Sequence, residues 1–110
     1  MKTIRVVLVT TPREEADAMA RSLVEGRLAA CVNVVPKVNS YYWWEDSIHN
    51  DEESLLICKT TVDRLPEFIE FIRENHPYEV PEVLALPLTE GMPEYISWVL
   101  EETSKTVKES

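Results

Sequence analysis

Residues 76–82, with the sequence His-Pro-Tyr-Glu-Val-Pro-Glu, bring an imidazole, a phenol and two carboxylates together around two prolines. A proline fixes its own φ at about −65° and biases the residue before it away from the α region. We therefore expect this segment to be a stiff, extended loop that holds its polar groups in fixed directions. Such a loop suits a metal site or a small-ligand site, and it suits a contact between subunits equally well.

His76 is the main metal candidate in this loop, because neutral imidazole binds copper and zinc. The carboxylates of Glu79 and Glu82 would complete a mixed nitrogen and oxygen site. The alternative is structural: His76 caps the end of a preceding helix, and the two glutamates form salt bridges or bond to a neighbouring subunit. The residues alone leave both interpretations open.

Two other residues of metal-binding type fit structural roles better. His49 lies among the acidic residues of 46–53, which would chelate an ion only if the turn folded back on itself, so we expect a solvated hairpin tip. Cys58 lies in an apolar run and is expected in the core. Cys31 and Cys58 lack the C-x-x-C spacing of a zinc or redox motif, which indicates two reduced, buried thiols.

A second candidate site is a ligand groove with Arg27, Lys59 and Tyr78. Arg27, Lys59 and Thr60 would bind an anion at the helix start near Pro12, where backbone N–H groups and the helix dipole favour negative charge. No glycine-rich phosphate loop supports such a site. The alternative is that Arg27 and Lys59 pair with acidic residues on the surface.

The composition limits the possible partners. The 110 residues are 45% hydrophobic, enough for one domain over residues 1–110 with its own core. The chain has 20 acidic and 11 basic residues, and its net charge of −9 repels nucleic-acid backbones and anionic membranes. It shows no signal-peptide pattern and no apolar run near the ~18 residues that a membrane span needs. We expect a soluble cytoplasmic protein that binds neither nucleic acid nor membrane.

The elements that position these residues begin with a strand and a helix. Residues 3–10 contain the apolar run 6–9 and are expected to form a central strand. A helix start follows, with Thr11 as N-cap, Pro12 in the first turn and Glu14 as the other half of a capping box. Apolar residues spaced three and four apart continue this helix to Gly26.

A long hairpin is expected next. Residues 28–35 form a strand that continues past Pro36, which should mark a bulge or an edge position because it cannot donate a ladder hydrogen bond. The polar residues 45–53 hold the turn, and residues 54–61 return as the partner strand. Four consecutive aromatic residues near the tip cannot all be buried by one short chain, so we expect another subunit to cover them. These residues are Tyr41, Tyr42, Trp43 and Trp44.

The rest of the chain completes an α+β pattern. A helix over residues 63–75 leads into the loop, a strand spans 83–88, and a third helix runs from Pro93 to a polar tail at 104–110. This order predicts a ferredoxin-like βαββαβ sandwich with an extra C-terminal helix. Its four-stranded antiparallel sheet should carry the helices on one face.

Several motifs resemble those of one known family. They are TTP (10–12), RLAACVN (27–33), SYYWW (40–44), KTT (59–61), HPYEVPE (76–82) and Tyr95-x-x-Trp98. In this order, and without an obvious insertion from about residue 6 to residue 100, they are similar to the motifs of the CutA divalent-cation tolerance proteins.

The resemblance implies a tight homotrimer, similar in architecture to PII signalling proteins, with a cytoplasmic role in the response to copper and other divalent ions. It implies no established enzymatic activity. The aromatic residues 41–44 would lie in the trimer interface, where the hairpin pairs with a neighbouring sheet. The resemblance also adds Cys31 to the metal candidates, as a soft ligand for Cu(I). Its apolar neighbours favour a core position instead, unless Cys31 faces a lateral cleft of the trimer that His76 approaches. Some related sequences carry another cysteine where this chain has Val9, which argues against a cysteine-rich copper site.

Three classes of function compete. The first is a non-enzymatic trimer that binds divalent metal, copper above all. The second is a PII-like signalling or scaffold trimer that binds a small ligand or a protein in its grooves. The third, a phosphate-cleaving enzyme or an RNA-binding domain on the same fold, is disfavoured because only Gly26 and Gly91 are available and no basic surface exists.

Overall fold

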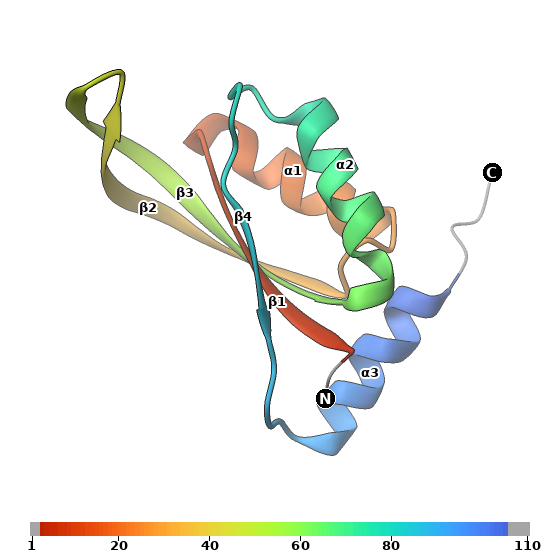
Figure 1. Cartoon of the computed structure of the whole chain (residues 1–110). Coiled ribbons are helices and arrows are strands. Elements are labelled where there is room, and N and C mark those ends of the chain that lie inside the picture. Colours follow the sequence, from red (N-terminus) through yellow and green to blue (C-terminus); the bar gives the residue numbers. More distant parts are fainter. Residues whose placement is uncertain (1–2, 106–110) are drawn as a thin grey trace.

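The computed structural model describes residues 3–105 and shows strands and helices in the expected order (Figure 1). The strands are β1 (Ile4–Thr11), β2 (Cys31–Trp44), β3 (Ser47–Thr61) and β4 (Val83–Pro87). The helices are α1 (Arg13–Glu25), the short 3₁₀ helix η1 (Val62–Arg64), α2 (Leu65–Asn75) and α3 (Pro93–Ser104). The expected polar tail begins inside α3, and residues 106–110 lie outside the described part.

Within the described residues, the four strands form one antiparallel sheet in the order β2-β3-β1-β4. The expected α+β class and antiparallel sheet are confirmed. β1 is central and pairs along its whole length with β3, from Ile4 opposite Thr61 to Thr11 opposite Ser54. Its other edge pairs with β4. This central position explains why residues 6–9 are apolar on both faces.

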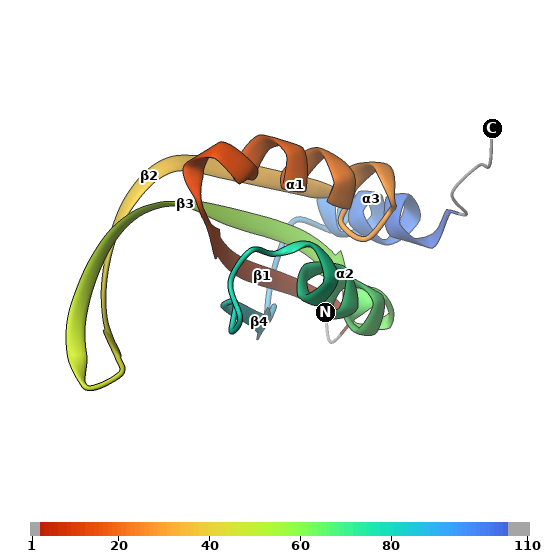
Figure 2. The same cartoon turned by 90° about the horizontal axis from the view of Figure 1, so that it is seen from above.

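The hydrophobic core lies between one face of the sheet and the helices α1 and α2, which Figure 2 shows on the same side of the strands. Alternate residues of β1 and β3 point into this core. The buried strand members are Val7, Val9, Leu56 and Cys58. The buried helix members are Ala16, Met19, Leu23, Phe68 and Ile72. Their helical spacing gives α1 and α2 each one apolar side, as the sequence pattern predicts.

α3 lies on the opposite face of the sheet, so the expectation that all helices share one face is wrong (Figures 1 and 2). Ile4 and Thr61 are cross-strand partners whose side chains point away from the core, yet both are buried, as is Val99 of α3. None of the three belongs to the core cluster. α3 follows the last strand and is not a crossover between strands, so the handedness rule that places α1 and α2 does not apply to it.

The start of α1 also differs from expectation. The helix begins at Arg13, the N-cap residue is Pro12, and no side chain caps it, so the expected capping box of Thr11 and Glu14 is wrong. Thr11 instead stays in β1, where its side chain is fully buried and its hydroxyl has no hydrogen-bond partner. Strand pairing therefore holds Thr11 and shifts the helix start along the chain.

The hairpin turn is much shorter than expected. It consists of Glu45 and Asp46, whose φ angles are 50° and 63°, and a two-residue turn of type I′ needs positive φ at both positions. The expectation that residues 45–53 hold the turn is wrong, because residues 47–53 belong to β3 and pair with residues 38–44. The polar character of 47–53 reflects exposure near the tip of the hairpin.

The hairpin projects past the rest of the sheet and curves (Figure 2). Its ladder is irregular between Val35 and Val38, which confirms the bulge expected at Pro36. Ser54 supports this bulge, because its hydroxyl donates a hydrogen bond to the Pro36 carbonyl at 2.7 Å. A bulge bends its strand and increases the local twist, so this position redirects the hairpin.

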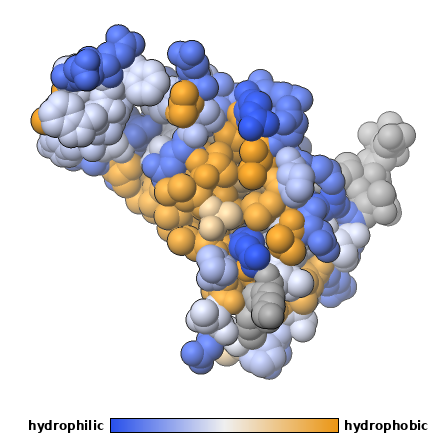
Figure 3. Space-filling view, in the orientation of Figure 1, coloured by the Kyte–Doolittle hydropathy of each residue, from blue (hydrophilic) through white to orange (hydrophobic). Residues whose placement is uncertain are grey.

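The sheet face that carries α3 is only partly covered. Leu84 and Leu86 of β4 are 56% and 48% exposed, and Figure 3 shows hydrophobic surface across the middle of the molecule. The register places them beside half-buried apolar residues of β1 and β3. We call this set the open face. Its members are Val6, Leu8, Leu55, Ile57, Leu84 and Leu86.

Candidate functional site

His76 fixes the beginning of the loop at residues 76–82. Its side chain is buried, Nε2 lies 2.7 Å from the Thr10 carbonyl oxygen, and Nδ1 lies 3.1 Å from the backbone nitrogen of Tyr78. A carbonyl only accepts and an amide N–H only donates, so the ring is the tautomer with its proton on Nε2. The His76 backbone N–H also bonds to the Ile72 carbonyl and caps α2. His76 therefore joins the loop to β1 and α2.

The loop is extended at His76 but bends over residues 77–80, so the expectation of an extended segment holds only in part. Tyr78 lies in this bend. Its ring packs against His76, with the ring centroids 4.7 Å apart, and its hydroxyl donates a hydrogen bond to Oε2 of Glu53 at 2.9 Å. The loop is thus tied to the hairpin as well.

Glu53 is the unusual member of this pair, because a carboxylate with only 4% of its surface exposed normally faces a cation. No ion pair within residues 3–105 includes Glu53. Its neighbour Tyr78 is affected in turn, since burial first and the bonded carboxylate second raise the pKa of the phenol far above its ordinary value. The pair therefore holds a neutral phenol against a poorly solvated carboxylate.

A cavity of about 570 Å³ lies where the hairpin, the end of β1 and the loop meet. This volume is within the range of small-molecule sites, roughly 300–1,000 Å³. Its lining is aromatic on the hairpin side and acidic on the loop side, and it includes no lysine or arginine. The lining residues are Thr10, Ser40, Tyr41, Tyr42, Trp44, Glu53, Tyr78, Glu79, Val80 and Glu82.

The four aromatic residues near the hairpin tip do not act alike. Tyr41, Tyr42 and Trp44 line the cavity, whereas Trp43 does not and is 72% exposed. The Tyr42 hydroxyl donates a hydrogen bond to Asp51, which raises the pKa of the phenol above its ordinary value. Their expected place in a subunit interface stays a prediction.

The four predicted metal ligands are only partly brought together. Glu79 and Glu82 line the cavity, but both nitrogens of His76 already have partners. Cys31 of β2 pairs with Lys59 of β3, and Lys59 pairs with Val6 of β1. His76 instead bonds to Thr10, further along β1. Val6 and Thr10 are four residues apart on one strand, about 13 Å. Within residues 3–105, no three His, Cys, Asp or Glu side chains converge to hold a metal ion.

Cys31 and Cys58 lie on opposite faces of the sheet, because Cys31 pairs with Lys59 and Cys58 pairs with Val32. Cys58 is fully buried, and burial raises the pKa of its thiol to about 12. Cys31 is half-buried and close to Tyr95 of α3, so the expectation of a second buried core thiol is wrong. Its position in β2 turns it to the face away from the core. His49 stacks on Tyr42 and contacts Ser47 at the exposed tip.

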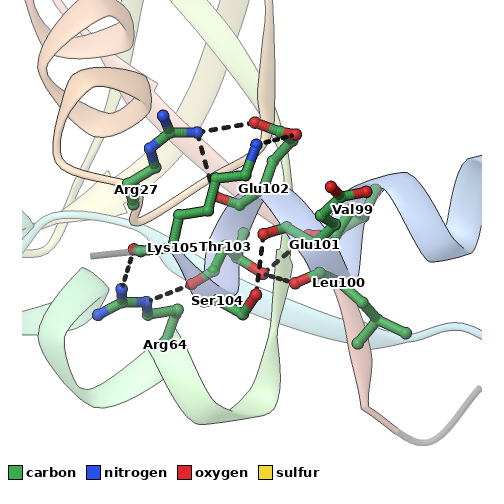
Figure 4. A network of polar contacts seen from close by, with 9 residues as sticks. All are labelled: Arg27, Arg64, Val99, Leu100, Glu101, Glu102, Thr103, Ser104 and Lys105. Carbon is green, nitrogen blue, oxygen red and sulfur yellow. Dashed lines mark hydrogen bonds and ion pairs between the residues drawn. The ribbon is translucent and has the colours of Figure 1, made fainter. Parts of the chain in front are cut away.

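The predicted ligand groove is not assembled in this chain, because Arg27, Lys59 and Tyr78 lie in three different places. Arg27 has a positive φ of 61° and forms an ion pair with Glu102 of α3, 2.7 Å long (Figure 4). Lys59 Nζ contacts Asn33 on the neighbouring strand. Arg27 pairs with an acid, as the structural alternative expects, whereas Lys59 bonds to the amide of Asn33 and to no acid within residues 3–105.

Thr60 does not take part in an anion site either. Its hydroxyl donates a hydrogen bond to the Leu28 carbonyl at 2.6 Å. Thr60 lies opposite Arg5, at the other end of β1 from Pro12 and the helix start. The predicted grouping of Thr60 with the start of α1 is therefore wrong, since the length of β1 separates them.

Glu53 is the site residue that the sequence reasoning missed. The polar pattern predicts one turn over residues 45–53, and this prediction does not separate the single acid that the fold buries from its neighbours. With a two-residue turn at 45–46, the pairing places Glu53 opposite Val38, close to the bulge, on the same face as Tyr42 and Trp44. The signal in the sequence is the alternation of side chains between the two faces of the hairpin, which identifies the position of Glu53 once a two-residue turn is assumed.

The fold and the cavity define a class: a small α+β protein with a projecting hairpin and an acidic, aromatic cavity at its base. The description "CutA1 divalent ion tolerance protein" belongs to the family model that matches residues 5–102. The chain belongs to this family.

None of its helices within residues 3–105 combines the length and the apolar character that a membrane crossing requires.

Individual relatives agree with this assignment. The chain is 50% identical over 99 residues to the divalent-cation tolerance protein CutA of Thermus thermophilus, covering 89% of this chain and 96% of that one. It is 46% identical to the chloroplastic protein CutA of Arabidopsis thaliana, covering 89% of this chain and 54% of that one. The solved structure of the Thermus protein has a TM-score of 0.88 at 47% identity, covering 90% of this chain and 97% of that one.

Proposed function

We propose that this protein acts in divalent-cation tolerance by binding divalent ions directly, without enzymatic activity, and that copper is among those ions. The observation that carries the proposal is the family match over residues 5–102, together with two loop carboxylates on one acidic cavity. Residues 3–105 of one chain offer an incomplete ligand set, so a partner subunit or a change at His76 would complete the coordination.

The donors have different affinities for metals. Glu79 and Glu82 offer oxygen, which suits hard divalent ions, whereas Cu(II) and Zn(II) favour imidazole nitrogen. His76 would ligate only by releasing either the Thr10 carbonyl or the Tyr78 amide. Cys31 lies elsewhere on the sheet and would act in a separate site.

Calorimetric titration with Cu(II) and Zn(II) tests the proposal. We expect binding that weakens in a Glu79→Gln/Glu82→Gln variant and remains in a Glu74→Gln control, since Glu74 is an exposed residue of α2 outside the cavity. A Cys31→Ser/His76→Asn double variant measures how much the other two candidate ligands contribute to the metal affinity. Absence of binding above background, or binding that all of these variants leave unchanged, would contradict the proposal.

We also propose a cytoplasmic homotrimer with a ferredoxin-like subunit. The strand order and the two crossover helices support the subunit fold. The open face and the exposed hairpin support assembly, because monomers rarely leave a large apolar surface or a long strand edge uncovered. Sedimentation analysis should give three times the mass of one chain, and Leu86→Asp on the open face should lower it.

A PII-like signalling or scaffold role is the second candidate. The cavity at the base of the hairpin favours it, because a volume of about 570 Å³ accommodates a small molecule and exceeds what one metal ion needs. A saturable ligand that binds in the presence of a metal chelator would support this role over the first.

A further inference from the structure

We propose that the cavity between the hairpin and the loop binds an organic cation: a methylated ammonium or a guanidinium group on a short apolar stem. This goes beyond divalent metal binding, because it assigns the cavity a ligand of another class. Three features of the lining lead to it: a buried carboxylate without an ion pair among residues 3–105, aromatic walls and an acidic rim.

The buried carboxylate is the first feature. Glu53 lines the cavity with 4% of its surface exposed, and its one side-chain partner among the described residues is the Tyr78 hydroxyl on Oε2. A neutral phenol satisfies a hydrogen bond but does not balance the charge. A buried carboxylate is stable when a cation compensates it, and no basic side chain lines this cavity. A cationic ligand would supply the missing charge.

The aromatic walls are the second feature. Tyr42 and Trp44 line the cavity from the hairpin, and Tyr78 lines it from the loop. Aromatic faces attract cations that carry apolar substituents, such as methylated ammonium and guanidinium groups. A bare divalent ion would gain little from such walls, because it depends on converging oxygen or nitrogen ligands.

The acidic rim is the third feature. Glu79 and Glu82 are exposed residues of the loop that also line the cavity, and neither forms an ion pair within residues 3–105. Their charges raise the local concentration of cations and repel anions. Phosphate-bearing ligands are therefore disfavoured at this site.

The ligand group has two possible sources, a free small molecule or a basic side chain of another protein. Choline represents the first, N-acetylarginine methylamide represents the second, and 3,3-dimethylbutan-1-ol is the uncharged analogue of choline. Each is titrated by calorimetry into the protein in its native oligomeric state, with EDTA present. We expect at least one cation to bind about tenfold more tightly than the alcohol, as charge and aromatic contacts predict.

The relative affinities of the two cations identify the source, with choline the tighter for a free small molecule and the arginine derivative the tighter for a protein side chain. The variant Glu53→Gln keeps an oxygen that accepts from Tyr78 but removes the charge, and it should weaken cation binding about tenfold. The matched control Glu74→Gln should leave it unchanged. If Glu53→Gln does not fold, the exposed pair Glu79→Gln/Glu82→Gln should lower cation affinity by a smaller factor.

Two results would overturn the proposal: cations that bind no more tightly than the alcohol, or a folded Glu53→Gln protein that binds them as well as the parent. Because EDTA removes divalent ions, these results would leave metal binding untouched. Likewise, an absence of metal binding would not contradict the proposed binding of an organic cation.

Discussion

The hydroxyl of Tyr78 and the carboxylate of Glu53 are 2.9 Å apart, although one residue lies in the loop after α2 and the other in the hairpin. His76 bonds to the backbone of both Tyr78 and Thr10, so loop, hairpin and β1 form one connected unit. This connection gives the cavity walls fixed relative positions.

Tyr78→Phe should destabilise the fold by about 1–2 kcal/mol, because it leaves the buried Glu53 carboxylate without its hydrogen bond. Denaturant unfolding measures the change. Tyr41→Phe is the control, since Tyr41 is 71% exposed and forms no side-chain hydrogen bond within residues 3–105. Equal effects of the two substitutions would show that the bond contributes nothing.

The same pair predicts a loss of stability in alkali. The pKa of Tyr78 is raised from an ordinary value of 10.0, so the folded state holds this proton more tightly than the unfolded state. The resulting stability is complete below pH 10.0 and is lost as the pH rises towards the folded pKa. In Tyr78→Phe, the free energy of unfolding should fall less steeply above that pH, with Tyr42 and Tyr95 retaining part of the slope.

Two buried threonines should respond oppositely to the same substitution. Thr11→Val should be neutral or stabilising by up to about 1 kcal/mol, because the Thr11 hydroxyl has no hydrogen-bond partner. Thr60→Val should destabilise by about 1–3 kcal/mol, because it leaves the Leu28 carbonyl without its donor. Unfolding free energies of the two variants test the contrast, and equal losses would contradict it.

Cys58 should resist alkylation in the folded protein. Its side chain is inaccessible and burial raises the pKa of its thiol to about 12, so almost no thiolate exists at mildly alkaline pH. Iodoacetamide labelling followed by peptide mass analysis should find Cys58 modified only after unfolding in urea. Labelling of Cys58 at the unfolded rate in native protein would refute this arrangement.

Glu102→Gln should loosen α3. Bonds from Lys105 and then Arg27 lower the pKa of the Glu102 carboxyl, so the stability that it contributes is present above its ordinary pKa and is lost as the pH falls through its folded pKa. Amide hydrogen exchange near neutral pH should speed up in α3 of the variant and stay unchanged in α1 and α2. Glu101→Gln is the control on the same helix.

Much of the fold follows from local patterns. The apolar periodicity of α1 and α2 and the run at residues 6–9 locate the core, because burial of one face leaves a regular trace. The bulge at Pro36 follows from a missing backbone donor. The placement of α3 on the other face does not follow, because no local signal tells which side of a sheet a final helix will cover.

The site is less accessible to sequence reasoning. The loop residues His76, Glu79 and Glu82 are recognisable by type, but their partners come from distant strands. His76 bonds to Thr10, and Tyr78 reaches Glu53, which the sequence alone does not separate from its acidic neighbours. A hydrogen bond between residues far apart depends on strand register, and a wrong turn length misplaces every residue of one strand.

The C-terminal end of α3 is bonded to arginine side chains from other parts of the chain. Its final turn contains no basic residue, yet Arg27 and Arg64 of other elements bond to the carbonyls of Glu102 and Thr103 (Figure 4). Cations at that end of a helix offset its dipole, and short isolated helices are marginal in water. A synthetic peptide of residues 93–105 should therefore be mostly unstructured, because it lacks both guanidinium groups.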